Sequence, residues 1–175
     1  MSKKKTSTFY LTERLTCTAS GTPVTATIDL GAYVDVADRQ GIAIEAVDFI
    51  IQGTTAASEL TAALTSPTEV HMQVSDLNRG GTIQFADDRA LVASGRLMYT
   101  SGGFLSQAAD MYPDIFGAKD GVRIIVNDQL YLTASTNDIA SGQSVNVTVR
   151  VKAHVCSLTA KDWMAIAIQS TAADN

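Results

Sequence analysis

Hydrophobic and polar residues alternate almost without error along residues 144–155, "SVNVTVRVKAHV". The apolar positions are Val145, Val147, Val149, Val151, Ala153 and Val155, and the polar positions are Ser144, Asn146, Thr148, Arg150, Lys152 and His154. This period of two predicts a β-strand with one dry face and one wet face. At roughly 3.3 Å per residue the strand would reach about 40 Å, well beyond an average strand.

Two further strand-like runs lie near the start of the chain, at 9–20 and 24–31, separated by the turn residues Gly-Thr-Pro. Their closeness predicts that they pair as a β-hairpin. Residues 42–53, "IAIEAVDFIIQG", are more apolar than alternating, and this pattern predicts a central strand.

The next segment, 54–69, has alanines and leucines at helical spacing. This spacing predicts one or two helical turns, with Ser58 as the cap and Pro67 as the stop. A strand is expected at 70–77, followed by a turn at 78–81, where adjacent glycines permit positive φ angles.

Strand-like sequence continues at 82–88 and 90–101, with Gly95 as a candidate bulge. The β pattern then breaks over 102–121, which contains aromatic residues, proline and glycine. We expect a long loop there, with a helical turn at 105–110. Loops of about 20 residues in a compact domain are usually functional or contact partners.

The clearest hairpin signal lies in 122–136, where Asn127 and Asp128 separate two apolar runs. Both residues tolerate left-handed dihedral angles, which suits a tight turn. Residues 137–143 predict a loop, and 160–170 predict a last short strand or helix.

These runs amount to eight or nine strands and little helix, without the alternation of strands and helices that marks a parallel sheet. The pattern predicts an all-β fold, an antiparallel β-sandwich of the jelly-roll type with about eight strands and long loops. In that fold the last long strand runs the full height of a sheet and pairs on both sides. The expected parts are a basic N-terminal arm at 1–8, one jelly-roll domain at 9–170 and a tail at 171–175.

Composition narrows the function. The chain has 175 residues, of which 46% are hydrophobic and 18% charged, below the usual quarter. A low-charge surface suits a protein that is covered by neighbours, although a β-protein with a Ser/Thr surface would look the same. The net charge of −5 argues against a general nucleic-acid binder. The run Lys3, Lys4 and Lys5 departs from this, as either a weak nucleic-acid contact or a solvated tail.

Candidate chemistry is sparse. His71 and His154 are the only histidines, and neither has a second ligand at metal-binding spacing. There is no GxSxG elbow, phosphate-binding loop or GxGxxG motif, so we expect no catalytic, cofactor or metal site. Cys17 and Cys156 lie far apart in strand-like sequence, which favours buried free thiols over a disulfide. No signal peptide or transmembrane span is expected.

Acidic residues recur in two loops, as Asp110, Asp114 and Asp120 and as the pair Asp87 and Asp88. Their spacing matches no EF-hand, so we interpret them as solvated loop acids, with a structural Ca²⁺ at a subunit contact as the alternative.

Large aromatic residues in unusual places are the candidate subunit interface. Phe104, Tyr112 and Phe116 lie in the long loop, where they would either pack beneath it or dock into a neighbour. Trp163 is either a plug of the core or an interface anchor.

Three segments together resemble the single jelly-roll capsid proteins of small tailless icosahedral viruses: "MSKKKTST", "IAIEAVDFIIQ" and "SVNVTVRVKAHV". The resemblance lies in the whole architecture, because the chain carries no diagnostic motif. It implies a coat protomer that assembles with copies of itself into a closed shell, together with other capsid proteins in some viruses. It also implies a location in the virion after synthesis in a host cytoplasm. The arm with Lys3, Lys4 and Lys5 would then face the genome or an inner membrane and contact it weakly.

Two other classes of function stay open. One is a carbohydrate- or receptor-binding sandwich, such as part of a phage tail or fibre, with a shallow aromatic site at Tyr112 and Phe116. The other is an enzyme on a cupin-like jelly roll, which would need several clustered histidines. A binding module would stay monomeric or trimeric, whereas a coat protein would form large particles.

Overall fold

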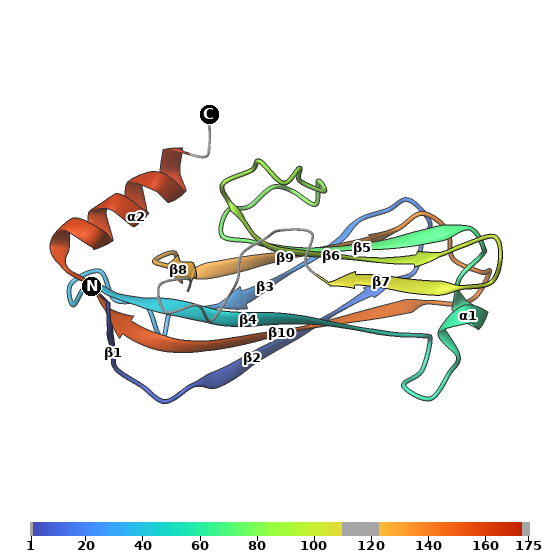
Figure 1. The fold of residues 1–175 in the computed structure, drawn as a ribbon, viewed down its shortest axis with the longest axis horizontal. Coiled ribbons are helices and arrows are strands. Elements are labelled where there is room, and N and C mark those ends of the chain that lie inside the picture. The colour runs from blue at the N-terminus through green and yellow to red at the C-terminus, as the bar shows by residue number, and fades with distance from the viewer. Residues whose placement is uncertain (1, 110–122, 173–175) are drawn as a thin grey trace.

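The computed structural model describes residues 2–109 and 123–172, which form two antiparallel sheets packed face to face (Figure 1). Sheet A contains β1 (Lys3–Lys4), β2 (Phe9–Cys17), β10 (Val145–Ser157), β4 (Gln40–Gln52) and β8 (Arg123–Ile125). Sheet B contains β3 (Val24–Asp29), β9 (Gln129–Thr136), β5 (Thr68–Ser75), β6 (Leu91–Tyr99) and β7 (Leu105–Ala109). The described helices are α1 (Leu60–Ala63) and α2 (Ala160–Ala172).

The strand order is that of a jelly roll, so the predicted all-β sandwich is confirmed. β2 pairs with β10, β3 with β9, β4 with β8 and β5 with β6, all antiparallel, as in a long hairpin wrapped around a sandwich. β10 also pairs with β4, and β9 also pairs with β5, which joins these pairs into two sheets. β1 and β7 are additions to the eight jelly-roll strands.

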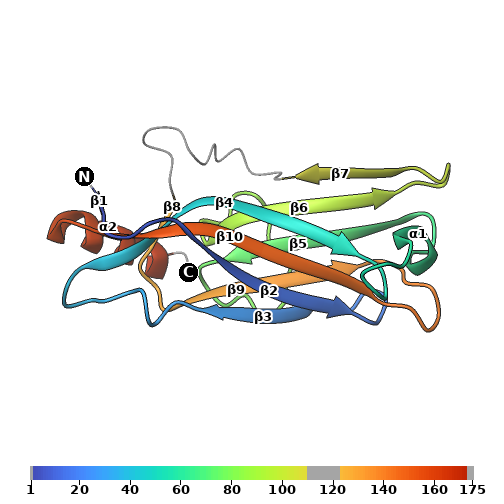
Figure 2. The same ribbon diagram turned by 90° about the horizontal axis from the view of Figure 1, so that it is seen from below.

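β10 is the long alternating strand that the sequence predicts. It pairs with β2 and the short β1 along one edge and with β4 along the other (Figure 2). The six apolar residues of its dry face are each at most 4% exposed. The strand is therefore long because it spans the height of sheet A and has partner strands on both sides.

Both predicted hairpins are wrong. β2 and β3 lie in opposite sheets, and so do β8 and β9 on either side of Asn127 and Asp128. The chain between them crosses from one sheet to the other. Two adjacent strands can bury their dry faces within one sheet or across a sandwich, and the pattern of residues is the same in both cases.

Three smaller predictions in the middle of the chain are also wrong. Residues 82–88 form no strand but belong to a loop at 76–90. Residues 105–109 form β7 instead of a helical turn. Gly95 is in regular register, and the bulge on β5 and β6 lies between Val74 and Ser75 instead.

The helical predictions hold in part. The N-cap of α1 is Glu59, without a side-chain capping bond, and the hydroxyl of Ser58 instead bonds to the backbone N and O of Thr55, each at 2.9 Å. Such a local turn competes with capping. The helix ends before Pro67 because Leu64 is already extended. The last segment, left open between strand and helix, is helix α2. No helix among the described residues is long and apolar enough to cross a membrane.

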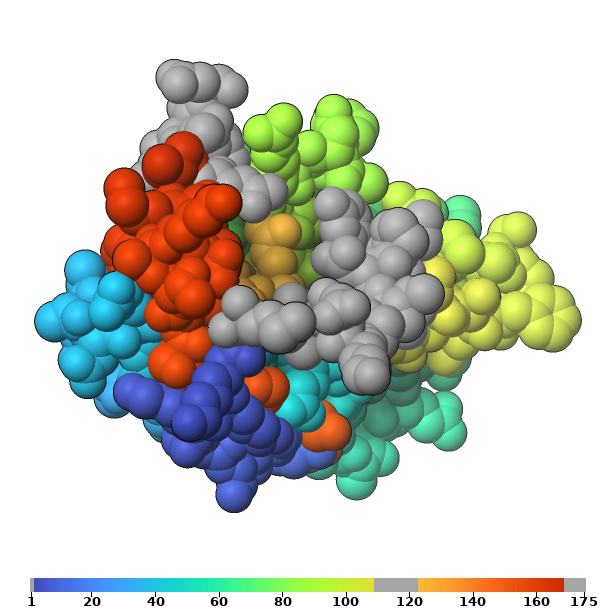
Figure 3. Space-filling view, turned by 60° about the vertical axis from the view of Figure 1, so that its left-hand side comes forward, coloured from blue at the N-terminus to red at the C-terminus, as the bar shows by residue number. Residues whose placement is uncertain are grey.

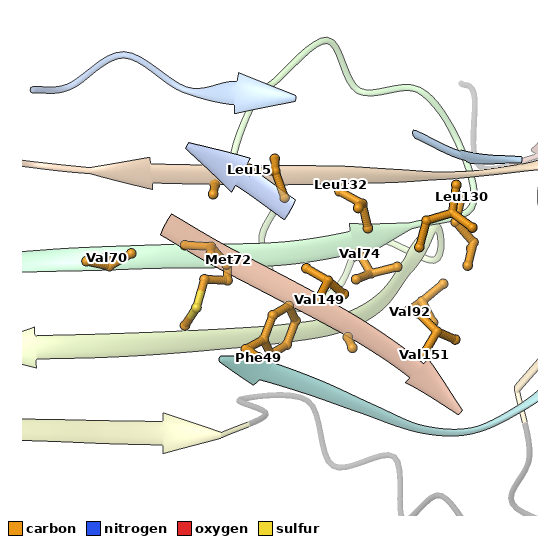
Figure 4. Close-up of a cluster of buried hydrophobic side chains, with 14 of the residues drawn as sticks. Leu15, Phe49, Val70, Met72, Val74, Val92, Leu130, Leu132, Val149 and Val151 are labelled. Atoms are coloured by element: carbon orange, nitrogen blue, oxygen red, sulfur yellow. The ribbon is translucent and has the colours of Figure 1, made fainter. Parts of the chain in front are cut away.

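Two clusters of buried side chains hold the fold together. The main core lies between the sheets and includes Leu15, Phe49, Val70, Met72, Val74, Val92, Leu130, Leu132, Val149 and Val151 (Figure 4). The second lies beneath α2, where Trp163 and its helix neighbours pack on Ala43, Val126, Cys156 and Leu158. Sheet A is thus covered on both faces at this end, which explains why Ile42, Ala43 and Ile44 are all buried.

The two cysteines are buried free thiols, as the sequence predicts. Burial raises the pKa of Cys17 to about 11 and also raises that of Cys156. Both thiols therefore stay protonated near neutral pH and behave as small apolar core groups.

Candidate functional site

Basic side chains gather on the outer face of sheet A. Arg14 on β2 and Arg150 and Lys152 on β10 occupy the alternate, outward positions of these neighbouring strands. They lie on the wet face for the same reason that the intervening valines are buried: successive side chains of a strand point to opposite sides. The hydrophobic pattern of β10 thus also determines where its charges lie.

The N-terminal arm adds Lys4 to this surface. Lys4 lies opposite Cys156, on the outward side of β10, whereas Lys3 and Lys5 alternate to the other side, where the ammonium of Lys5 donates to Gln40 Oε1 at 2.9 Å. Lys3 and Lys4 form β1, which pairs with Ser157 and Cys156 of β10, and the amide of Lys5 donates to the carbonyl of Val155 at 2.8 Å. The arm is therefore a strand that extends the edge of sheet A beside β2. The sequence alternatives, a solvated tail or an interior arm, did not include this docking.

Glu45 links the arm to the sheet. The register between β4 and β10 shifts between Lys152 and Ala153, which leaves Glu45 as the extra residue of a β-bulge. Its carboxylate accepts hydrogen bonds from His154 Nδ1 at 2.8 Å and from the Thr8 hydroxyl at 3.0 Å. The ammonium groups of Lys152 and Lys4 lie 3.3 and 3.5 Å away. A bulge re-aims a side chain, and here it brings a carboxylate to the middle of a basic surface.

This setting stabilises the ionised form of Glu45. Burial alone would raise the pKa of its carboxyl. The hydrogen bonds from His154, Thr8 and Lys152, with the charge of Lys4, outweigh that effect and hold the pKa at about 2, below its ordinary value of 4.5. At neutral pH the carboxylate is therefore ionised and neutralises only part of the charge around it.

An aromatic ring is exposed on the same surface. The guanidinium of Arg150 lies over the ring of Tyr10 at 4.8 Å from its centroid, and Tyr10 is 53% exposed. A cation–π pair of this kind attracts the guanidinium to the face of the ring. Planar guanidinium groups beside aromatic rings suit phosphate and base contacts.

The basic surface contrasts with the rest of the chain. We define it as Lys4, Arg14, Arg150 and Lys152, with Glu45 and Asp48 as the acids among the described outward residues of sheet A. Four basic groups against two acidic ones leave a surplus of two positive charges. Because the whole chain carries −5, the remainder carries −7. The charge is thus segregated, which the net charge alone conceals.

The predicted interface residues do not form one site. Phe104 lies at the turn between β6 and β7 and is 74% exposed, whereas Trp163 lies on α2, at the opposite end of the sandwich (Figure 1). Trp163 packs into the second core cluster of its own chain, in agreement with the core-plug alternative. Tyr112 and Phe116 lie outside the described residues, so their role stays a prediction.

Further exposed apolar residues were missed by the sequence reasoning. Val36, Met164 and Ile168 are each at least 59% exposed, in the loop before β4 and on α2. Figure 3 shows this loop, α2 and the N-terminal arm gathered at one end of the molecule. No pattern in the sequence could have brought together segments from both termini and the 30–40 region.

The acidic residues that the sequence singles out do not form a metal site among the described residues. Asp110, Asp114 and Asp120 lie outside the described residues. Asp88 is not a solvated acid, because it pairs with Arg79 at 3.1 Å and accepts the amide of Ala90 at 2.8 Å. Within residues 2–109 and 123–172 no group of three or more His, Cys, Asp or Glu residues could hold a metal ion.

No family model matches the chain, and no curated protein sequence is significantly similar to it.

Proposed function

We propose that this protein is a viral coat protomer that self-assembles into a closed icosahedral shell, with the basic surface of sheet A facing a polyanionic interior. The observation that carries the proposal is the segregation of charge on a jelly roll: a surplus of two positive charges on one face and −7 elsewhere. Jelly rolls occur in capsids but also in lectins and cupins, so the fold alone does not choose among these functions.

The charge pattern favours a contact with a large anion. A surface with four Lys and Arg residues attracts a polyanion such as a genome or an anionic membrane, and the attraction weakens with salt. The docked arm places Lys4 on this face beside β10 instead of leaving it on a solvated tail. An acidic exterior would keep assembled particles apart in solution.

The exposed apolar residues support lateral contacts between protomers. They lie at opposite ends of the elongated sandwich: Val36, Met164 and Ile168 at one end, Phe104 and Leu105 at the other. A contact that joins one end of a protomer to the other end of its neighbour is heterologous, and such contacts close into rings when the rotation permits. A closed icosahedral shell is built from such rings of protomers.

Assembly is the direct test. Purified protein would be studied by negative-stain electron microscopy and light scattering, alone and with a single-stranded oligothymidylate. Uniform closed particles, formed more readily with the oligonucleotide at low salt, are expected. The double variant R14Q/R150Q should lose most of the oligonucleotide effect. The control R89Q/K161Q, which removes two charges elsewhere, should keep it. A protein that stays monomeric or trimeric in all of these conditions would contradict the proposal and favour the binding module.

A further inference from the structure

The loop at 76–90 creates a pocket on the outer face of sheet B, opposite the basic surface. The loop connects β5 to β6 and stands out from sheet B (Figure 1). Between the loop and the two strands lies a hollow of about 230 Å³, lined by Ile83, Phe85 and Ala86 from the loop and by His71, Ser94 and Arg96 from the strands. Pockets for drug-sized ligands measure roughly 300–1,000 Å³, so this one suits a single small ring.

The loop is held firmly. The side chain of Gln73 bonds twice to the backbone of Gln84, as donor to its carbonyl and acceptor from its amide, each at 2.7 Å. The Arg79–Asp88 pair joins the two halves of the loop at 3.1 Å. Phe85, which follows the clamped residue, is 86% exposed. An aromatic ring held outward on a braced loop, at the rim of a pocket, is placed to contact something outside its own chain.

The polar side of the pocket is electrically balanced. The carboxylate of Glu69 lies 3.5 Å from Arg96 Nε and 3.3 Å from His71 Nε2. Burial, and next the charge of Arg96, lower the pKa of His71, so its imidazole is neutral near neutral pH. The positive charge of Arg96 is matched by the negative charge of Glu69. This balance favours an uncharged ligand with hydrogen-bonding groups over an anion or a cation.

We propose that this pocket binds one neutral pyranose ring, whose C–H face stacks on Phe85 while its hydroxyl groups bond to Arg96, His71 and Ser94. A sugar ring has the required size, one apolar face and a rim of hydroxyl donors and acceptors. The site is independent of the proposed shell function, because a coat protomer and a binding module could each carry it. On a coat protomer it would face outward, since sheet B lies opposite the basic surface.

Saturation-transfer NMR with methyl glycosides of glucose, galactose, mannose and N-acetylglucosamine tests the proposal, and it works equally for monomers and large particles. At least one glycoside should bind saturably, with Kd on the order of 1 mM, as expected for one small ring. F85A should weaken binding at least tenfold. The control D87A changes an exposed neighbour that does not line the pocket and should bind as the unchanged protein does.

Three results would overturn the proposal. The first is that none of the four glycosides gives a saturable signal, and the second is that F85A binds as tightly as D87A. The third uses methyl glucuronoside as an additional, negatively charged probe: binding of this probe alone would show an anion site. Thermal melting of both variants verifies that each is folded. R96Q is a second variant, which should weaken binding without removing the stacking ring.

Discussion

Gly95 of sheet B leaves the space that the ring of Phe49 of sheet A occupies. A Cβ atom at position 95 would lie 2.9 Å from Phe49 Cδ2 and 3.1 Å from Met72 Cε (Figure 4 shows both neighbours). The glycine that the sequence suggested as a bulge is therefore a contact between the sheets. The two sheets approach as closely as they do here because one side chain is missing.

The first prediction concerns this contact. G95A should lower the free energy of unfolding by about 1–3 kcal/mol, because an added methyl group overpacks the core. Urea unfolding would measure the change. In the double variant F49L/G95A the smaller side chain should recover part of the loss. An unchanged stability of G95A would show that Phe49 and Met72 can move aside.

The dry face of β10 should not tolerate a charge. Val149 is 1% exposed, so V149D would bury an unpaired carboxylate and cost at least ~4 kcal/mol, enough to prevent folding. The matched variant T148D places the same group on the outer face, opposite Arg14, and should fold. Circular dichroism of both purified proteins makes the comparison. Normal folding of V149D would contradict the placement of this strand.

Acid should weaken the attachment of the arm. The pKa of Glu45 is about 2 in the folded protein and 4.5 when unperturbed, so its ionised form is stabilised by folding. This stabilisation is complete above about pH 4.5 and is lost as the pH falls towards 2. E45Q should therefore melt below the unchanged protein at pH 6, and the difference should vanish near pH 2. A difference that does not depend on pH would indicate that the charge of Glu45 contributes nothing.

The indole of Trp163 can be tested through the thiol beneath it. Its Nε1 is buried without a hydrogen-bond partner among the described residues, so W163F should be nearly neutral. W163A removes the ring from the cluster that buries Cys156 and should cost about 2 kcal/mol, the low end for an aromatic-to-alanine change. Labelling of Cys156 by a thiol reagent should become faster in W163A only. Equal labelling of the two variants would show that α2 does not protect the thiol.

A substitution of Phe104 can test assembly without disturbing the fold. Because it is 74% exposed, F104S should leave the melting temperature almost unchanged. If its end of the sandwich contacts a neighbour, the variant should form fewer particles at the same protein concentration, as measured by light scattering. Particles that form as before would exclude Phe104 from the interface.

The strands and their buried faces could be predicted from the sequence, because the alternation of apolar and polar residues is a local property. The strand at 144–155 is predicted almost to the residue, and every apolar position on it is buried. The sandwich class followed from the number of such strands and the scarcity of helix. The two hairpins failed because pairing partners are not local: β2 and β8 lie beside strands that are far away in the chain.

The candidate site could be predicted from the sequence only in part. The three lysines of the arm stand out in the sequence, but only Lys4 lies on the basic surface, and Arg14 and Arg150 join it only because β2 and β10 are neighbours. The pocket at Phe85 depends on a segment that was expected to be a strand. Its position is set by two hydrogen bonds between the side chain of Gln73 and the backbone of Gln84, and no periodic pattern in the sequence predicts these bonds.

The chain's alternation therefore decided which residues are buried and which face water, since each side chain's preference acts within its own strand. Tertiary structure alone decided which strands are neighbours, and with them the basic surface, the bulge at Glu45 and the pocket under the loop. The physical reason is that burial of dry faces can be achieved by several pairings, and only the packing of the whole core, including the space left by Gly95, selects one.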